Sequence, residues 1–270
     1  MYRSAALTAV APHVSAPPIA SVGRGLQVLR AFRSELTPLS NAELVRRTGL
    51  PKATVSRLTS TLLHLGYLRL APDGRSFQLA AGAFAIGHAY ASGSELLQLA
   101  NPFLQALGDR LETSATLAVP DASDMLYIAY RASPRITIRF GAGSVLPMGL
   151  TAIGRAYLWG LPDGERQPML EVLKRSAAPG QWPVMEAGIR ASFAELDATG
   201  TCAVLGAFNR NTYAVALPIR VGREQVLMAM SCGRASIRPD LARERQRITP
   251  VLKEAASQLE QILKDVEGWP

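Results

Sequence analysis

The chain has 270 residues, of which 48% are hydrophobic, so it is long enough for two domains that each bury a core. A membrane enzyme is not expected, because every stretch of about 18 residues is broken by a charge, a glycine or a proline. The net charge of +8 is unevenly spread: residues 1–80 carry ten basic and three acidic side chains, whereas the other 190 residues carry 19 and 18. This asymmetry indicates either a polyanionic partner for the N-terminal third or an ordinary solvated basic surface.

Residues 1–20 hold one arginine and scattered apolar side chains, which is too weak a pattern for a secretory signal. We interpret them as a disordered tail. The chain has only two cysteines, Cys202 and Cys232, so no disulfide framework is expected and a reducing cytoplasm suits the protein.

Two short helices are predicted next. Apolar residues at helical spacing place the first helix at about 22–33; they are Val22, Leu26, Leu29 and Phe32. Ser40 and Glu43 form a capping-box pattern that begins the second helix, and Gly49 can take the left-handed conformation that ends it.

A third helix should begin at Pro51, because the first helical turn tolerates the missing N–H of proline. Its apolar face, expected to pack on the first two helices, consists of Val55, Leu58, Leu62 and Leu65. The opposite face is small, hydroxylated and basic, with Ala53, Ser56, Arg57, Ser60 and His64. A helix, a glycine-containing turn and a second helix with an exposed polar start indicate a helix-turn-helix unit.

A β-hairpin should follow, with strands at 67–70 and 76–79 around the turn dipeptide Asp73-Gly74. A hairpin after the recognition helix makes a winged helix, and a basic wing tip can reach the DNA backbone. The alternative is a helical bundle with an unrelated hairpin, but the order of the capping box, turn glycine, basic face and wing favours DNA binding.

The chemistry of each side chain suggests its role on DNA. We expect groove contacts from Lys52, Ala53, Ser56, Arg57 and Ser60, with Arg57 the best candidate for a bidentate contact to guanine. We expect backbone contacts from Arg46, Arg47, Arg69 and Arg75, which add affinity without reading sequence. His64 lies too late on the helix to be expected at the DNA.

The remaining residues indicate a second domain of mixed α and β structure. A helix rich in small residues at 81–93 should link the two domains. Strand-like runs are found at 115–119, 125–131, 136–140, 201–205, 213–220 and 226–232. Helical patterns separate the third and fourth runs, which is typical of an α+β fold. A last helix should start at the N-cap residue Asp240 and bury Leu252, Ala256, Leu259 and Leu263.

The chain resembles the IclR family of bacterial transcriptional regulators from Ser21 to near its end. The resemblance rests on "SVGRGLQVLRAF", on "LSNAELVRRTGLPKATVSRLTSTLLHLGYL" and, most specifically, on "SPRITIRFGAGSVLPMGLTAIGRAYL". It implies an N-terminal winged helix-turn-helix domain (21–80), a linker helix (81–93) and a C-terminal antiparallel-sheet effector domain (94–270) of GAF/PAS-like form. It also implies homodimers or tetramers on palindromic double-stranded DNA, and a repressor role slightly more than an activator role.

The resemblance further implies an effector pocket on one face of the sheet. Carried over residue by residue, the pocket would use Met148, Gly149, Thr151, Ala152, Ile153, Val204, Ala214, Met230 and Cys232. Polar residues of the family pattern are replaced by apolar ones at three of these positions: Gly149, Val204 and Ala214. A site poor in donors and acceptors disfavours compact polar metabolites, so we expect an aromatic or other hydrophobic acid.

Two other interpretations of the C-terminal domain remain open. It could serve only for oligomerisation, with its apolar residues forming ordinary core, or it could be a thiol-redox enzyme that uses Cys202 and Cys232. We expect no enzyme, because both cysteines lie in apolar runs and no catalytic motif occurs. We also expect no metal site and no cofactor, because the three histidines are far apart in sequence.

Overall fold

The computed structural model describes residues 18–33, 37–136 and 140–267. The chain divides into two compact units, with the boundary between Gly93 and Ser94. Most of the predicted tail lies outside the described residues, and the first helix already begins at Ala20. In the described part of the chain, no helix is both long and apolar enough to cross a membrane.

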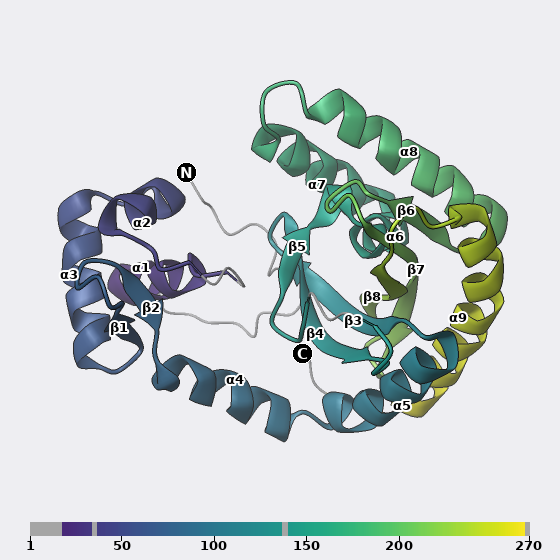
Figure 1. Ribbon diagram of the computed structural model, residues 1–270, viewed down its shortest axis with the longest axis horizontal. Helices are drawn as coiled ribbons and strands as arrows, with labels where there is room; N and C mark the ends of the chain where they lie inside the picture. Colours follow the sequence, from purple (N-terminus) through teal and green to yellow (C-terminus); the bar gives the residue numbers. More distant parts are fainter. Residues whose placement is uncertain (1–17, 34–36, 137–139, 268–270) are drawn as a thin grey trace. The chain divides into compact units, whose positions relative to one another are not determined.

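The first unit is a winged helix-turn-helix, as predicted (Figure 1). Its elements are α1 (Ala20–Arg30), α2 (Asn41–Thr48), α3 (Lys52–His64), β1 (Leu68–Leu70), β2 (Phe77–Leu79) and α4 (Ala81–Gly93). Strands β1 and β2 pair antiparallel, and a bridge from Leu39 to Phe77 ties the chain before α2 to the hairpin.

The ends of α2 follow from its sequence. The Ser40 hydroxyl accepts a hydrogen bond from the Glu43 backbone N–H at 3.2 Å, and Gly49 has a φ of 68°. Only half of the predicted capping box forms, because the Glu43 carboxylate pairs with Arg46 and Arg47 instead of turning back to Ser40.

The core of the first unit joins α1, α2 and α3 to the hairpin through Val28, Leu44, Val55, Leu62, Leu68 and Phe77. Three residues of the predicted apolar helix faces are exposed: Val22 at 58%, Leu26 at 54% and Leu65 at 58%. Helix α1 buries Val28 instead, and the Ala31 residue after it is also buried. Leu65 lies just after the last residue of α3. The spacing of apolar residues predicted where the helices are, but it did not predict how many of those residues are buried.

The second unit is a six-stranded antiparallel sheet with a helical layer on each face (Figure 1). Its strands are β3 (Ser114–Asp121), β4 (Asp124–Ala132), β5 (Val145–Pro147), β6 (Cys202–Leu205), β7 (Thr212–Val221) and β8 (Val226–Ala235), in the order β5-β4-β3-β8-β7-β6. Helices α5 (Glu95–Leu111) and α9 (Leu241–Leu263) cover one face. The other face carries η1 (Met148–Leu150), α6 (Ala152–Gly160), α7 (Asp163–Ser176) and α8 (Trp182–Thr199).

This α+β unit agrees with the predicted fold class. Five of the six predicted strands are present, and the strand expected at 136–140 is not: residues 137–139 lie outside the described residues, and Ile136 and Phe140 are not in a strand. Strand β5 was missed because three residues are too few to show an alternating pattern. The Asp240 carboxylate caps α9, and its four predicted core residues are buried, as expected.

Candidate functional sites

The N-terminal half of α3 presents the predicted polar face to solvent. Lys52, Ala53, Ser56, Arg57 and Ser60 are all exposed, because Val55, Thr59 and Leu62 take the buried side of the helix. The Ser56 hydroxyl accepts a hydrogen bond from the Asn41 side-chain amide at 3.0 Å. Asn41, at the first turn of α2, thus touches this face, and sequence reasoning missed it because the contact joins two helices.

Arg46 and Arg47 differ in their surroundings although they are adjacent. Both pair with the Glu43 carboxylate at 2.6 Å, and these hydrogen bonds lower the pKa of Glu43 to about 2. Arg46 stays 73% exposed, whereas Arg47 is only 21% exposed and also donates to the Ala31 carbonyl at 3.0 Å. Arg47 therefore ties α2 to the end of α1, a structural role that the sequence did not suggest.

The wing holds its basic residues outward on an ordered turn. The Asp73 carboxylate accepts hydrogen bonds from the backbone N–H groups of Ser76 at 2.8 Å and Arg75 at 2.9 Å. These bonds hold the pKa of Asp73 below its ordinary value, and Gly74 adopts a φ of 65°. Arg69 and Arg75 are both exposed, so the α3 face and the wing form a basic surface on one unit.

The second unit contains a cavity of about 720 Å³, a volume that includes its open mouth. One wall consists of Leu150 and the start of α6, and another consists of the β6–β7 loop with Phe208. The floor is the face of the sheet that α6 covers. The cavity is partly enclosed by these residues and partly open to solvent, so it can accept a small molecule.

Small and hydroxylated residues form the cavity floor in two rows across the strands. In one row Tyr130 lies opposite Thr116, and Thr116 lies opposite Ser231. The second row contains Ser114, Gly233, Ala214 and Val204. Directly opposed residues of antiparallel strands share a face, so the side chains of these rows other than Tyr130, which are short, leave the space above them open.

Aromatic rings line the cavity beside the floor. The Tyr127 and Tyr130 rings stack with their centroids 6.3 Å apart, and the Phe140 ring meets Tyr127 edge-on at 6.3 Å. Burial raises the pKa of both tyrosines, so their hydroxyls stay protonated at neutral pH. Aromatic faces next to neutral hydroxyls can hold a flat ligand that also needs a few hydrogen bonds.

The start of α6 lies at the edge of this space. Thr151 caps the helix: its hydroxyl accepts from the Gly154 N–H at 3.3 Å and donates to the Pro147 carbonyl at 2.9 Å. Ala152 and Ile153 line the cavity, and the first N–H groups of a helix have no acceptor within it. A carboxylate can bind at this end of the helix.

The cavity includes five of the nine residues named for the effector site: Thr151, Ala152, Ile153, Val204 and Ala214. Met230 and Cys232 do not line this cavity, because they alternate with Ser231 and Gly233 along β8 and pack toward α5 and α9. Met148 is fully buried and Gly149 packs against Met185, so neither lines the cavity.

This cavity is richer in donors and acceptors than the sequence led us to expect. Val204 and Ala214 are apolar, but the cavity lining also includes the hydroxyl groups of Ser114, Thr116, Thr212 and Ser231, together with those of the two tyrosines. The Thr212 hydroxyl is buried without a hydrogen-bond partner among the described residues. The cavity can therefore satisfy a ligand with both apolar and hydrogen-bonding groups.

The two cysteines cannot act as a pair, because they lie on opposite faces of the sheet. Cys202 packs with α6 and α8, whereas Cys232 packs with α5 and α9. Burial raises the pKa of each thiol to about 12. Within the described ranges, no cluster of potential ligands could hold a metal ion.

We expect neither thiol of the folded protein to react with a disulfide reagent at about pH 8, because both are protonated and inaccessible. Both should react once the chain is denatured. The absorbance of the chromophore that the reagent releases measures the number of reacted thiols in the folded and in the denatured protein. Rapid reaction of either cysteine in the folded protein would contradict this account of their burial.

The chain matches family models in both units. Residues 21–72 match the IclR helix-turn-helix domain, and residues 88–261 match the bacterial transcriptional regulator IclR C-terminal domain. The Pca regulon regulatory protein of Pseudomonas putida is 30% identical over 241 residues, which are 88% of this chain and 82% of that protein.

Solved structures share the fold over most of the chain. An IclR family transcriptional regulator from Brucella abortus superposes with a TM-score of 0.80 and 32% identity, covering 90% of this chain and 92% of that one. An IclR homologue from Microbacterium hydrocarbonoxydans, complexed with 4-hydroxybenzoate, has a TM-score of 0.64 and 22% identity, covering 90% of this chain and 98% of that one.

Proposed function

Because this chain belongs to the IclR family of bacterial transcriptional regulators, we propose that it binds operator DNA through α3 and the wing under the control of a small acid. The protein is a DNA-binding transcriptional regulator with a C-terminal effector domain. The cavity in the second unit is the observation that carries the effector proposal, since a domain that served only for oligomerisation would have no need of it.

On DNA, we assign base reading to α3 and backbone contacts to the wing and α2. Arg57 and Lys52 are exposed at the start of α3 beside small side chains, so the helix can enter a major groove closely. Arg46, Arg69 and Arg75 are exposed around it and suit phosphate contacts. Of the arginines assigned to the DNA backbone, Arg47 is the least suited to a phosphate contact, because its guanidinium already bonds to Ala31 and Glu43.

The effector we propose is an aromatic or other hydrophobic acid. Its ring would lie against Tyr127, Tyr130 and Phe140, and its carboxylate would meet the N–H groups of Ala152 and Ile153. The floor hydroxyls of Thr116 and Ser231 are available to a second polar group on the ring.

Thermal shift with a panel of acids tests this proposal. Benzoate and 4-hydroxybenzoate should raise the melting temperature by several degrees, since ligand at a hundredfold its Kd adds about 2.7 kcal/mol. Pyruvate and glyoxylate, which leave the aromatic walls unfilled, should have little effect. A shift with the two small oxoacids alone would disprove the proposed effector class.

We also propose that two copies associate through the first unit. Helix α4 has no buried residue, and it exposes Phe84 at 75% together with Ile86 and Tyr90. Helix α1 of the same unit exposes Val22 and Leu26. Apolar surface gathered on one small unit suits a second copy, and a dimer would present two recognition helices to a palindrome.

Replacing Phe84 with aspartate should weaken the dimer at least about tenfold, because burying a phenylalanine side chain contributes about 1.5–3 kcal/mol. Sedimentation velocity over a dilution series measures this change. Val184→Asp is the matched control, since Val184 is 76% exposed on α8 of the other unit. If both variants dissociate alike or neither does, α4 is not the dimer contact.

Selection of bound genomic fragments would identify the operator and the genes it controls. Repression is the direction we propose, with the protein acting in the cytoplasm. Transcription from the selected promoters in a deletion strain tests that direction, because loss of a repressor raises expression.

A further inference from the structure

Arg155 is a buried charged residue in the second unit. Only 7% of it is exposed, and its guanidinium donates three hydrogen bonds. Its Nε donates to the Gly149 carbonyl at 3.0 Å, and its Nη1 donates to the Gly188 carbonyl at 2.9 Å and to the Ser192 hydroxyl at 3.2 Å. One side chain thus joins the η1 turn, α6 and α8.

The helices are shaped around this guanidinium. A Cβ atom on Gly188 would lie 2.5 Å from Nη2 of Arg155 and 2.9 Å from its Cζ, so α8 can approach only without a side chain there. On the other side, a Cβ on Gly154 would lie 2.1 Å from the Met148 carbonyl oxygen. Two glycines therefore bring α6 against both the turn before it and the helix behind it.

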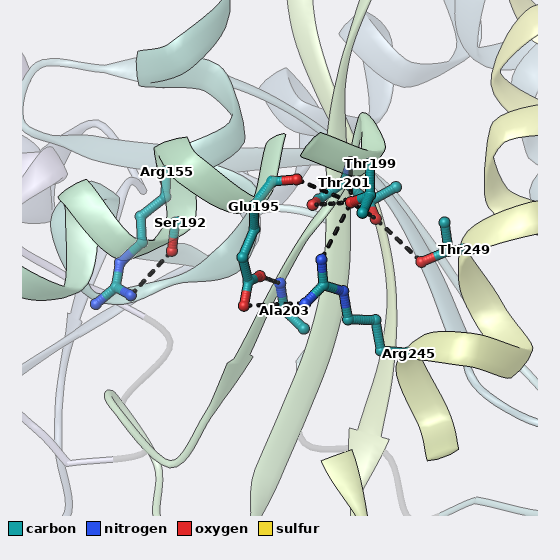
Figure 2. Close-up of polar contacts among 8 residues, drawn as sticks. All are labelled: Arg155, Ser192, Glu195, Thr199, Thr201, Ala203, Arg245 and Thr249. Atoms are coloured by element: carbon teal, nitrogen blue, oxygen red, sulfur yellow. Dashed lines mark hydrogen bonds and ion pairs between the residues drawn. The ribbon is translucent and has the colours of Figure 1, made fainter. Parts of the chain in front are cut away.

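Side chains of helix α8 also contact strand β6 and helix α9, as Figure 2 shows. The Glu195 carboxylate accepts from the backbone N–H of Ala203 at 2.9 Å and pairs with Arg245 of α9 at 3.1 Å. Ala203 precedes Val204, which lines the cavity. Arg155 thus connects one cavity wall to a helix that already holds the neighbouring edge strand.

We infer that Arg155 is a positioning residue for the effector cavity. Its guanidinium fixes the carbonyl of Gly149 and so holds the turn that leads into Thr151, Ala152 and Ile153 in the shape an acid can bind. A buried charge is unfavourable unless its donors are satisfied, and here the acceptors lie on separate elements, which makes the residue a clamp between them. That this turn takes part in ligand binding rests on the proposed function.

Hydrogen–deuterium exchange on the ligand-free full chain tests the clamp directly. Arg155→Lys keeps the charge but loses the planar fork, so amides of residues 148–153 should exchange at least tenfold faster. Amides of β3 and β7 should keep their rates. Arg190→Lys, on the exposed side of α8, should leave all of these rates unchanged. Unchanged exchange at 148–153 in Arg155→Lys, or equally faster exchange throughout the unit, would overturn the inference.

Gly188→Ala provides a second test that needs no ligand. With Arg155 present, the added methyl group should displace the guanidinium, lower the melting temperature and speed exchange at residues 148–153. In an Arg155→Met background the same substitution should be neutral or stabilising, because alanine is a better helix former than glycine. Additive effects of the two changes would show that they act independently, against the inference.

Binding of 4-hydroxybenzoate, measured by calorimetry, adds a functional result. If wild-type protein binds it, Arg155→Lys should raise its Kd at least tenfold, and an unchanged Kd would refute positioning of the acid site. If wild-type protein binds none of the acids, the proposed effector class fails, while the exchange experiments still decide whether Arg155 is the clamp.

Discussion

Replacing Arg57 with alanine should weaken operator binding by about 1–3 kcal/mol, which is roughly 5- to 150-fold in Kd, and should relax the preference for one base pair. The reason is the position of Arg57 on the exposed face of α3, beside Ser56 and Ser60, where a planar guanidinium can reach a guanine edge. Fluorescence anisotropy with the operator and with single-base variants measures both effects.

Arg75→Ala is the informative comparison, because Arg75 stands on the wing tip rather than on the recognition helix. It should weaken all DNA sequences alike and reduce the slope of log K against log salt by about 1. Arg190→Ala removes the same charge from an exposed site in the other unit and should change little. If Arg57→Ala and Arg75→Ala give the same base preference and salt slope, the division of roles is wrong.

Ala214→Leu should weaken effector binding, and so shift the response to higher effector concentration, while leaving DNA binding intact. Ala214 lies on the cavity floor between Gly233 and Val204, so a leucine there projects into the space that the ligand would fill. Forcing extra bulk into an occupied site costs about 1–3 kcal/mol, which raises the effector Kd roughly 5- to 150-fold. The space above residue 214 is open without ligand, so the domain should still fold.

Calorimetry with 4-hydroxybenzoate and operator binding with and without it measure the two properties separately. Ala198→Leu on the exposed side of α8 is the matched control, because it adds the same side chain away from the cavity. A normal effector response in Ala214→Leu would mean that the ligand binds elsewhere.

The winged helix-turn-helix could be predicted in detail because its signals are local. Ser40 and Gly49 mark the two ends of α2 through their capping preferences. Helix α3 has apolar residues on one side and polar residues on the other over its whole length. The hairpin follows from Asp73-Gly74 and the alternation beside it. Exposure of Val22, Leu26 and Leu65 was not foreseen, because a helical repeat does not say which neighbours are present to cover it.

The cavity was only partly foreseen. The pocket residues were named only from the family resemblance, and the cavity includes Thr151 and Ala152 but not Met230 and Cys232, which pack toward α5 and α9. A strand that is buried on both faces carries apolar residues throughout, so its sequence does not mark which alternate positions face a cavity. The hydroxyls of Thr116 and Ser231 escaped notice for a related reason, because they meet only when β3 pairs with β8.

Sequence alone thus determined the two-part design, the cationic recognition helix and the α+β class, since these depend on residues close together along the chain. Only the tertiary structure decided which side chains share the cavity and that Arg155 joins η1, α6 and α8. The Arg155 contacts link residues up to 37 positions apart, and the cavity joins strands that are still farther apart in the sequence. Their geometry is set by strand register and by close approach at glycines, and neither leaves a periodic mark in the sequence.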